Sequence, residues 1–184
     1  MTKITLKDNS TIDVTIRNAT QNDIPSLMLL NQKWQKSVLG ENIKDGFVGA
    51  AFSKETFAEL IHRKQITVTD FDNKVIGYYL LNNFSKDGII GKHEDFVTML
   101  KQKDKISKSS NICVGAQAVV DTEFMGSGIR PLMLDTLVEN MKGKYEYLFA
   151  TIAKDNPRAF KAHTRDGWTV VDEEESMFYV VFKV

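Results

Sequence analysis

The sequence has a single cysteine and no excess of charge of either sign. Cys113 alone cannot form a disulfide within the chain, and we expect it to be a buried strand residue. Lysine plus arginine (24) equals aspartate plus glutamate (24), so no net charge favours nucleic acid or an anionic membrane surface. We therefore expect partners that are small molecules or proteins, with no nucleic acid and no membrane.

Long apolar runs and linker-like segments are also absent. No stretch approaches the roughly 18 to 20 apolar residues that cross a bilayer, and the start, Met1 to Ile4, lacks an apolar signal segment. These absences predict a cytoplasmic protein. No repeat, low-complexity tract or Pro/Ser linker divides residues 1–184, which predicts one domain with an ordinary core, since 42% of residues are hydrophobic. No His, Cys and carboxylate spacing indicates a metal site.

Hydrophobic periodicity predicts the first half of the fold. Residues 12–17 alternate apolar and polar side chains, as in a strand with one buried face. A capping pattern at 20–23 opens a helix whose apolar face runs through Ile24, Leu27, Met28, Asn31, Trp34 and Val38. Ser53 could cap a second helix. Residues 65–71 and 75–81 are strand-like and are separated by Asp72-Asn73-Lys74, which predicts an antiparallel hairpin.

The second half alternates strands and helices around one long connection. Residues 84–110 are too long for a turn, and we expect them to be an insertion beside the site, with helical spacing at Phe96, Val97 and Leu100. Strands follow at 111–120, 145–153, 168–172 and 177–184. The predicted class is α/β, a mixed and largely antiparallel sheet of six to seven strands with helices on both faces.

A glycine-containing turn joins the strand that ends at Val119-Val120 to a helix. Gly126 and Gly128 precede a helical stripe that begins at Ile129. Glycines allow positive φ and close approach of backbone N–H groups, and a helix start adds unpaired donors, so the turn suits an anion. Two glycines at such a junction are also common turn chemistry without a ligand. The spacing fits neither a Walker loop nor a dinucleotide fingerprint.

A second motif lies near the C-terminus. Asn156 is a good N-cap, Pro157 suits the first helical position, and Gly167 ends the helix. The helix carries His163, whose ordinary pKa of about 6.5 would allow proton transfer near neutral pH. His163 could equally be a packed histidine bonded to a backbone carbonyl.

Together, the two motifs resemble those of the GNAT-type N-acetyltransferases. Glu123-Phe124-Met125-Gly126-Ser127-Gly128 is similar to the family's acetyl-CoA loop, Arg/Gln-x-x-Gly-x-Gly/Ala, and the last helix is similar to Asn-x-x-Ala-x-x-x-Tyr-x-x-x-Gly-Phe. The departures are Glu123, where the family has Arg or Gln, and His163, where it commonly has Tyr. The resemblance covers roughly Ile12 to Val184, apart from the insertion.

The resemblance implies an N-acetyltransferase that moves an acetyl group directly from acetyl-CoA, its cosubstrate, to a primary amine of a small molecule, amino acid or peptide, without a metal. A homodimer is an open alternative to a monomer. His163 would protonate the leaving thiolate. Arg130, Arg158 and Lys161 could pair with phosphates, and the candidate bases are Glu94, Asp121, Glu123 or a water chain. The alternative is a non-catalytic GNAT-like module that binds coenzyme A derivatives or a protein partner. The implied coenzyme contacts are Val119, Val120, Phe124, Met125, Gly126, Ser127, Gly128, Ile129, Arg130, Asn156, Ala159 and Phe160.

Overall fold

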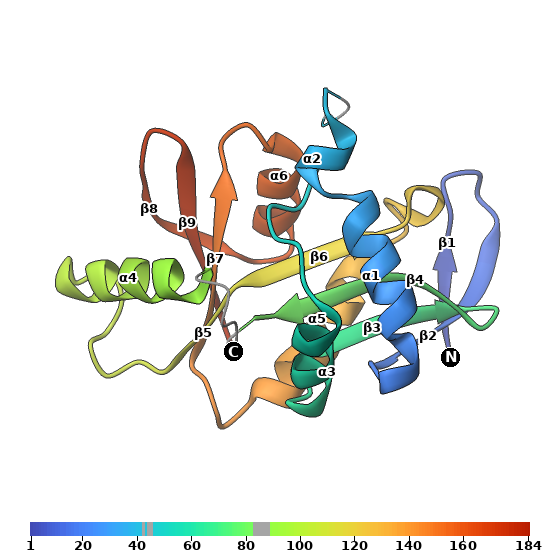
Figure 1. The fold of residues 1–184 in the computed structure, drawn as a ribbon, viewed down its shortest axis with the longest axis horizontal. Coiled ribbons are helices and arrows are strands. Elements are labelled where there is room, and N and C mark those ends of the chain that lie inside the picture. The colour runs from blue at the N-terminus through green and yellow to red at the C-terminus, as the bar shows by residue number, and fades with distance from the viewer. Residues whose placement is uncertain (42, 44–45, 83–88) are drawn as a thin grey trace.

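The computed structural model describes residues 1–41, 43, 46–82 and 89–184, and their strands form two sheets (Figure 1). The first sheet has five antiparallel strands in the order β1-β2-β3-β4-β6. The second has the order β5-β7-β9-β8, with β5 and β7 parallel. The strands are β1 (Thr2–Thr5), β2 (Thr11–Asn18), β3 (Ile66–Phe71), β4 (Lys74–Leu81), β5 (Ile112–Val114), β6 (Ala116–Val120), β7 (Tyr147–Ala153), β8 (Thr169–Glu173) and β9 (Met177–Lys183).

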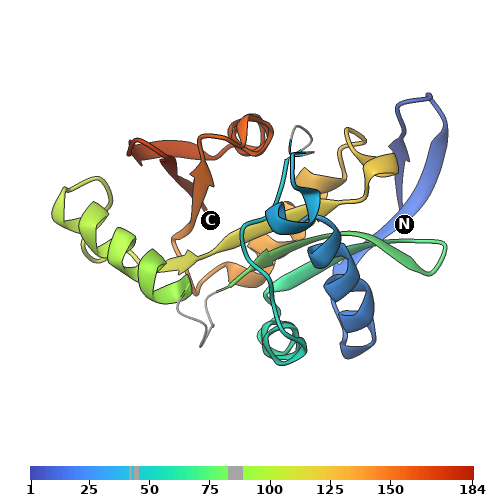
Figure 2. The same cartoon turned by 45° about the horizontal axis from the view of Figure 1, so that its top comes forward.

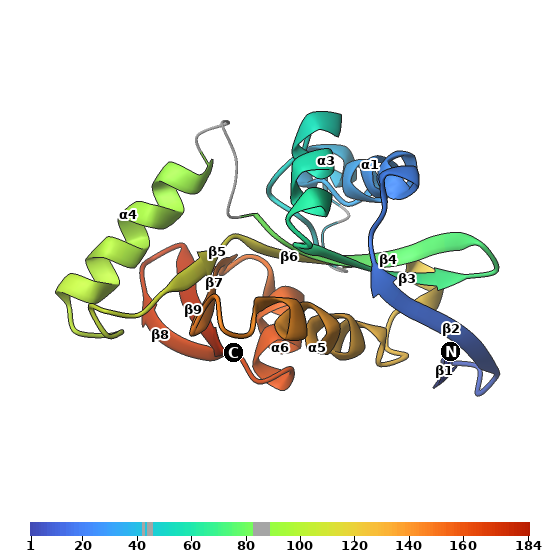
Figure 3. The ribbon, with the colours of Figure 1, turned by 90° about the horizontal axis from the view of Figure 1, so that it is seen from below.

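Helices cover both faces of the sheets, as Figure 3 shows. On one face lie α1, α3 and α4, and on the other lie α5 and α6. The predicted α/β class with helices on both faces is therefore confirmed. The described residues form nine strands, not the predicted six to seven, and these strands divide between two sheets. The helices are α1 (Ile24–Lys33), α2 (Lys36–Leu39), α3 (Lys54–His62), α4 (Ile89–Gln102), α5 (Ile129–Met141) and α6 (Pro157–Arg165), with short 3₁₀ turns at Gln21–Asp23 and Thr122–Phe124.

Local sequence signals explain several of these elements. Thr20 and Asp23 form the predicted capping box before α1, and the Ser53 side chain accepts from the Thr56 backbone N–H at the start of α3. Asp72 and Asn73 both have positive φ, which confirms the predicted hairpin between β3 and β4. The predicted helix was too long, because α1 ends at Lys33 and Val38 lies in α2. Trp34 is buried as predicted, but Met28 (40% exposed) and Val38 (58% exposed) are not.

The described part of the predicted insertion packs against the second sheet. Helix α4 packs its Leu100 and Phe96 against the second sheet, where Phe149 and Tyr179 belong to the same apolar cluster. Phe96 and Tyr179 lie with ring centroids 4.8 Å apart. Residues 84–88 of the insertion lie outside the described residues. Strand β1, which pairs with β2 at the edge of the first sheet, was not predicted from the sequence.

Candidate functional site

The two sheets separate at Gly115, between β5 and β6. Up to Val114 the chain pairs with β7, and from Ala116 it pairs with β4 instead. Gly115 has φ +82°, and a Cβ there would lie 2.9 Å from the Asn82 carbonyl oxygen. Both the conformation and the space therefore require glycine. Beyond this point β6 and β7 diverge (Figures 1 and 2), and a cleft opens between them.

One edge of β6 faces this cleft, and no strand of the described residues pairs with that edge. The Asp121 N–H donates to the Ile76 carbonyl and the Gly115 carbonyl accepts from Asn82, so the odd-numbered positions bond to β4. In an antiparallel pair these bonds alternate, and Ala116, Ala118 and Val120 therefore turn their N–H and C=O groups to the open edge. An extended ligand with amide groups could bond to such an edge as an added strand does.

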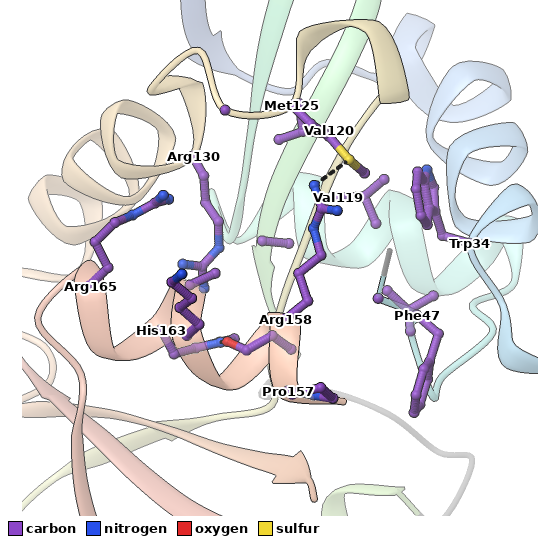
Figure 4. Close-up of a pocket in the computed structure, with 17 residues that line it drawn as sticks. Trp34, Phe47, Val119, Val120, Met125, Arg130, Pro157, Arg158, His163 and Arg165 are labelled. Carbon is purple, nitrogen blue, oxygen red and sulfur yellow. Dashed lines mark hydrogen bonds between the residues drawn. The ribbon is translucent and has the colours of Figure 1, made fainter. Parts of the chain in front are cut away.

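A cavity of about 590 Å³ lies along this edge and is called here the glycine-turn cavity (Figure 4). Four segments enclose it: the end of β6, the turn before α5, one face of α6, and Trp34 with the segment after α2. Its lining residues are Trp34, Gly46, Phe47, Val48, Ala118, Val119, Val120, Met125, Gly126, Arg130, Pro157, Arg158, Ala159, Lys161, Ala162, His163 and Arg165.

The glycine turn, residues 121–128, borders one end of this cavity through Met125 and Gly126. Gly126 and Gly128 have φ +87° and +83°, as predicted, and Gly128 is the N-cap of α5. The turn is held from within, since the Asp121 carboxylate accepts from the Thr122 N–H and the Ser127 hydroxyl donates to the Phe124 carbonyl. Among the described residues, no hydrogen bond is recorded from the backbone N–H of Gly126 or Gly128. These donors and the start of α5 form a site that suits an anion.

Cationic side chains gather around the same cavity. Arg130, Arg158, Lys161 and Arg165 line it, and no described lining residue is acidic. Arg130 is paired with the buried Asp166, so its charge is largely compensated. Arg158 reaches from α6 across the cavity to the sulfur of Met125, 3.0 Å away (Figure 4). The cavity therefore favours a ligand with several negative charges.

His163 projects from α6 and lines both this cavity and a second one behind it. Its Nδ1 is 2.8 Å from the Ala159 carbonyl oxygen, which can only accept, so Nδ1 carries the proton and Nε2 is a lone-pair acceptor. Nε2 is buried without a partner among the described residues. Burial, aided by the charge of Arg130, lowers the pKa of His163 to about 3.

The expectation that His163 acts as an imidazolium acid therefore needs correction. At pH 7 the ring is neutral, and its free nitrogen accepts hydrogen bonds and does not donate them. The ring also packs edge-on against Trp168, with centroids 5.2 Å apart. Whether His163 takes part in catalysis in another way stays a prediction.

The second cavity, of about 320 Å³, is called here the Asn82 cavity. It meets the glycine-turn cavity at Phe47, Val48, Ala118, Ala159 and His163, which line both. Its described lining contains no charged side chain. The remaining lining residues are Gly49, Ala50, Phe52, Asn82, Gly115, Ala116, Gln117, Thr151, Ile152, Ala153, Asn156 and Met177.

The structure brings together most of the residues that the sequence pointed to. Val119, Val120, Met125, Gly126, Arg130, Ala159 and His163 line the glycine-turn cavity. Ser127 and Gly128 belong to the turn but line neither cavity. Asn156 lines the Asn82 cavity and caps α6 by accepting from the Ala159 N–H, while its side-chain amide donates to the Phe47 carbonyl.

Three predicted contacts lie elsewhere. Phe124 is buried beneath the turn against Phe71, and Ile129 is a core residue. Phe160 packs on Phe178, with ring centroids 4.3 Å apart, and does not line either cavity. These three support the site from the core side and leave the lining to their neighbours.

The candidate bases also lie outside both linings. Asp121 is paired with Lys33 at 2.5 Å and caps its own turn, while Glu123 and Glu94 are exposed. Among the described residues, no group of three His, Cys, Asp or Glu side chains could hold a metal ion. Cys113 is buried in β5, as predicted, and burial raises the pKa of its thiol to about 12. Within the described chain, no helix combines the length and apolar character needed to cross a membrane.

Sequence reasoning missed Trp34, Phe47, Arg165 and Asn82. Phe47 comes from a segment with no periodicity, fixed by the Val48 N–H donating to the Trp34 carbonyl and by the Asn156 bond to Phe47. This segment reaches α6 only in the folded chain, and no pattern in the sequence indicates that contact. Asn82 could have been singled out, because it is a polar residue directly after the buried strand β4.

Comparisons with known proteins find the same fold. No family model and no curated protein matches the sequence. Solved structures do match. One is a GNAT-family acetyltransferase from Listeria monocytogenes, at 13% identity, TM-score 0.63 and 100% of both chains. Another is the PaiA N-acetyltransferase from Thermoplasma acidophilum in complex with coenzyme A, at 17% identity, TM-score 0.62, and 94% of this chain and 100% of the other.

A third match is YncA from Salmonella typhimurium, solved with its cofactor acetyl-CoA, at 14% identity, TM-score 0.60 and 94% of both chains. At these identities the likeness shows the fold. The chain has the GNAT acyltransferase fold, as the two sequence motifs predicted.

Proposed function

We propose that this chain is an acetyl-CoA-dependent N-acetyltransferase that acts on a primary amine. The observation that carries the proposal is the glycine-turn cavity, where free backbone donors, an open strand edge and four cationic side chains meet a neutral second cavity at His163. Acetyl-CoA combines phosphates with an amide-containing arm that ends in a thioester. The phosphates suit the backbone donors and cationic side chains of the cavity, and the amides of the arm suit the open strand edge.

The residues that would hold the coenzyme follow from their chemistry. The N–H groups of Gly126 and Gly128 and the start of α5 suit the pyrophosphate. Arg158 and Lys161 supply positive charge for phosphates, while Arg130, already paired with Asp166, is better placed to fix the first turn of α5 against α6. The open edges of Ala118 and Val120 suit the amides of the pantetheine arm.

Transfer then requires an amine beside the thioester. The amine nitrogen forms a bond to the acetyl carbon, the carbon–sulfur bond breaks with its electron pair going to sulfur, and a proton leaves the nitrogen. The chain contributes position above all, because two bound reactants need no further encounter. His163 lines both cavities, and its neutral ring forms part of the wall where the thioester and the amine would meet.

The protein supplies no carboxylate in the described linings, so the amine must arrive without its proton. Water is then left as the acid for the thiolate, whose conjugate acid has a pKa near 8.5 in simple thiols. The rate should therefore rise with pH as the ammonium form of the acceptor loses its proton. His163 should add no further pH-dependent step to the rate profile.

The non-catalytic alternative draws on two observations. Glu123, where the family has Arg or Gln, is exposed and away from the cavity, and His163 lacks the proton that the family's Tyr would give. A module of this kind would bind coenzyme A derivatives and transfer nothing.

The test has two parts. Calorimetry with acetyl-CoA measures binding, and release of free thiol across a panel of primary amines, with mass spectrometry of the products, measures transfer. Binding with amine-dependent thiol release supports the enzyme. Binding without transfer to any amine supports the non-catalytic module, and no binding contradicts both.

A further inference from the structure

We infer that Lys7, at the tip of the β1–β2 hairpin, binds the pyrophosphate group of the coenzyme together with the glycine turn. This inference rests on the proposed function and adds a binding residue to its site. Lys7 precedes the part of the chain that resembles the acetyltransferase family, which begins at about Ile12, so neither sequence motif points to it.

The first observation is the position of Lys7 beside the glycine turn. A Cβ atom built on Gly126 would lie 3.5 Å from Cε of Lys7. Nζ is one bond beyond Cε on a flexible stem, so the ammonium group can reach an anion held at the Gly126 N–H. Gly126 also lines the glycine-turn cavity, which places Lys7 at the edge of that cavity. In Figure 1 the tip of the hairpin (blue) lies beside the turn between β6 and α5 (gold).

The second observation is the packing that holds the hairpin against the turn. Ile4 of β1 and Val14 of β2 belong to the same buried apolar cluster as Phe124 of the glycine turn. Leu6, next to Lys7, packs against that cluster. Lys7 is therefore carried by an element that is anchored to the turn, and its place beside Gly126 follows from the core beneath both.

Hydrogen bonds fix the backbone at the tip of the hairpin. The Asn9 N–H donates to the Leu6 carbonyl at 3.1 Å, and the Leu6 N–H donates to the Ser10 carbonyl at 2.8 Å. The carboxylate of Asp8 accepts from the N–H and the hydroxyl of Ser10, at 2.9 and 2.6 Å, and is therefore engaged within the tip. Because the backbone is already ordered, binding has to order only the exposed side chain of Lys7.

The third observation is the charge of the glycine turn itself. The turn carries two carboxylates, those of Asp121 and Glu123, and Lys33 pairs with the first of them. Arg158 reaches the cavity from α6. Lys7 adds a positive charge from the hairpin, so a pyrophosphate on the turn meets cations from two separate elements, which offsets its repulsion by the carboxylates.

A binding experiment tests this inference without relying on turnover. Inorganic pyrophosphate and coenzyme A are each titrated by calorimetry into the wild type, Lys7→Gln and Lys3→Gln. Lys7→Gln should weaken both ligands about fivefold, which is the effect of one charge pair at about 4 Å in water. Its melting temperature should be unchanged, because Lys7 is exposed.

Lys3→Gln is the matched control. It removes the same charge from the same hairpin, but Lys3 is exposed and directly precedes the buried Ile4, so its side chain points to the other face of β1. Both affinities should therefore stay at the wild-type value in Lys3→Gln. Lys7→Arg, which keeps the charge, should also bind both ligands as the wild type does. Equal weakening in Lys7→Gln and Lys3→Gln would overturn the inference, because net charge would then explain it.

Two coenzyme fragments identify the group that Lys7 contacts. Dephospho-coenzyme A keeps the pyrophosphate and lacks the 3′-phosphate, and it should lose the same affinity in Lys7→Gln as coenzyme A does. Pantetheine has no phosphate and should bind the wild type and Lys7→Gln equally. Unchanged affinities in Lys7→Gln, or a loss confined to coenzyme A with its 3′-phosphate, would overturn the inference.

Chemical labelling of the wild type gives an independent readout. Lysines are reductively methylated with and without coenzyme A, and the rate at each site is measured by mass spectrometry. Coenzyme A should protect Lys7 from methylation and leave the rate at Lys3 unchanged. An equal rate at Lys7 with and without coenzyme A would contradict the contact.

Failure of the proposed function is separately visible. Protein that does not bind coenzyme A contradicts the proposed function, while the titrations with inorganic pyrophosphate still decide whether Lys7 acts with the glycine turn. If neither ligand binds, both the proposed function and this inference are wrong.

Discussion

The neutral, buried state of His163 predicts how the stability of the protein changes with pH. In the folded chain, burial and Arg130 lower the pKa of His163 to about 3, while in the unfolded chain its pKa is about 6.5. Because the folded pKa is the lower one, the unfolded state binds the proton first on acidification. The stability contribution is therefore full above pH 6.5 and is lost progressively between pH 6.5 and 3.

The size of the effect follows from these two values. Between pH 7 and pH 5 the unfolded imidazole becomes protonated and the folded one does not, which costs about 2 kcal/mol of unfolding free energy. Urea unfolding at the two pH values should show this loss in the wild type beyond the loss in His163→Gln, which has no titrating ring. Equal losses in both proteins would show that His163 is not desolvated as the structure has it.

Substitution of His163 also bears on catalysis. His163→Phe should lower turnover at saturating acetyl-CoA and leave the coenzyme affinity within a few-fold, because His163 lines both cavities and its neutral ring carries no charge to bind phosphate. A limb near pH 6 to 7 in the wild-type rate profile that disappears in His163→Gln would refute the neutral ring.

Three further changes test the coenzyme side of the site. Gly126→Val with Gly128→Val should abolish acetyl-CoA binding measured by calorimetry, whereas Gly143→Val, which has positive φ and open space elsewhere, should spare it. Arg158→Gln should raise the Kd for acetyl-CoA about tenfold and weaken its salt dependence; an unchanged Kd would place the phosphates elsewhere. Arg130→Gln should lower stability by about 3 kcal/mol in urea unfolding, because Asp166 stays buried, and adding Asp166→Asn should restore part of it.

The sequence predicted those parts of the fold that local chemistry determines. The hairpin at Asp72-Asn73, the glycine turn, and the cap at Asn156 all form where their residues indicated, because each depends on backbone conformations or hydrogen bonds within a few residues. Two features depend on neighbours that are distant in the chain: the pairing of β1, and the break of one predicted strand into β5 and β6. Hydrophobic periodicity within a segment therefore does not predict them.

The candidate site shows the same division. The motif placed His163 on a helix that lines the cavity, but the pKa of His163 depends on Trp168 and Arg130 packing around it, which no spacing reveals. Phe47 reaches the cavity through two hydrogen-bonded contacts made in the folded state. The place of Lys7 beside Gly126 is likewise visible only once the hairpin and the turn are packed together.

A crystal structure with bound coenzyme A tests the central claim most directly. The account predicts the pyrophosphate on the N–H groups of Gly126 and Gly128, the pantetheine arm along the edge of Ala118 and Val120, and the sulfur at the junction of the two cavities beside His163. Coenzyme A bound outside the glycine-turn cavity, or bound there with its sulfur pointing away from the Asn82 cavity, would contradict it.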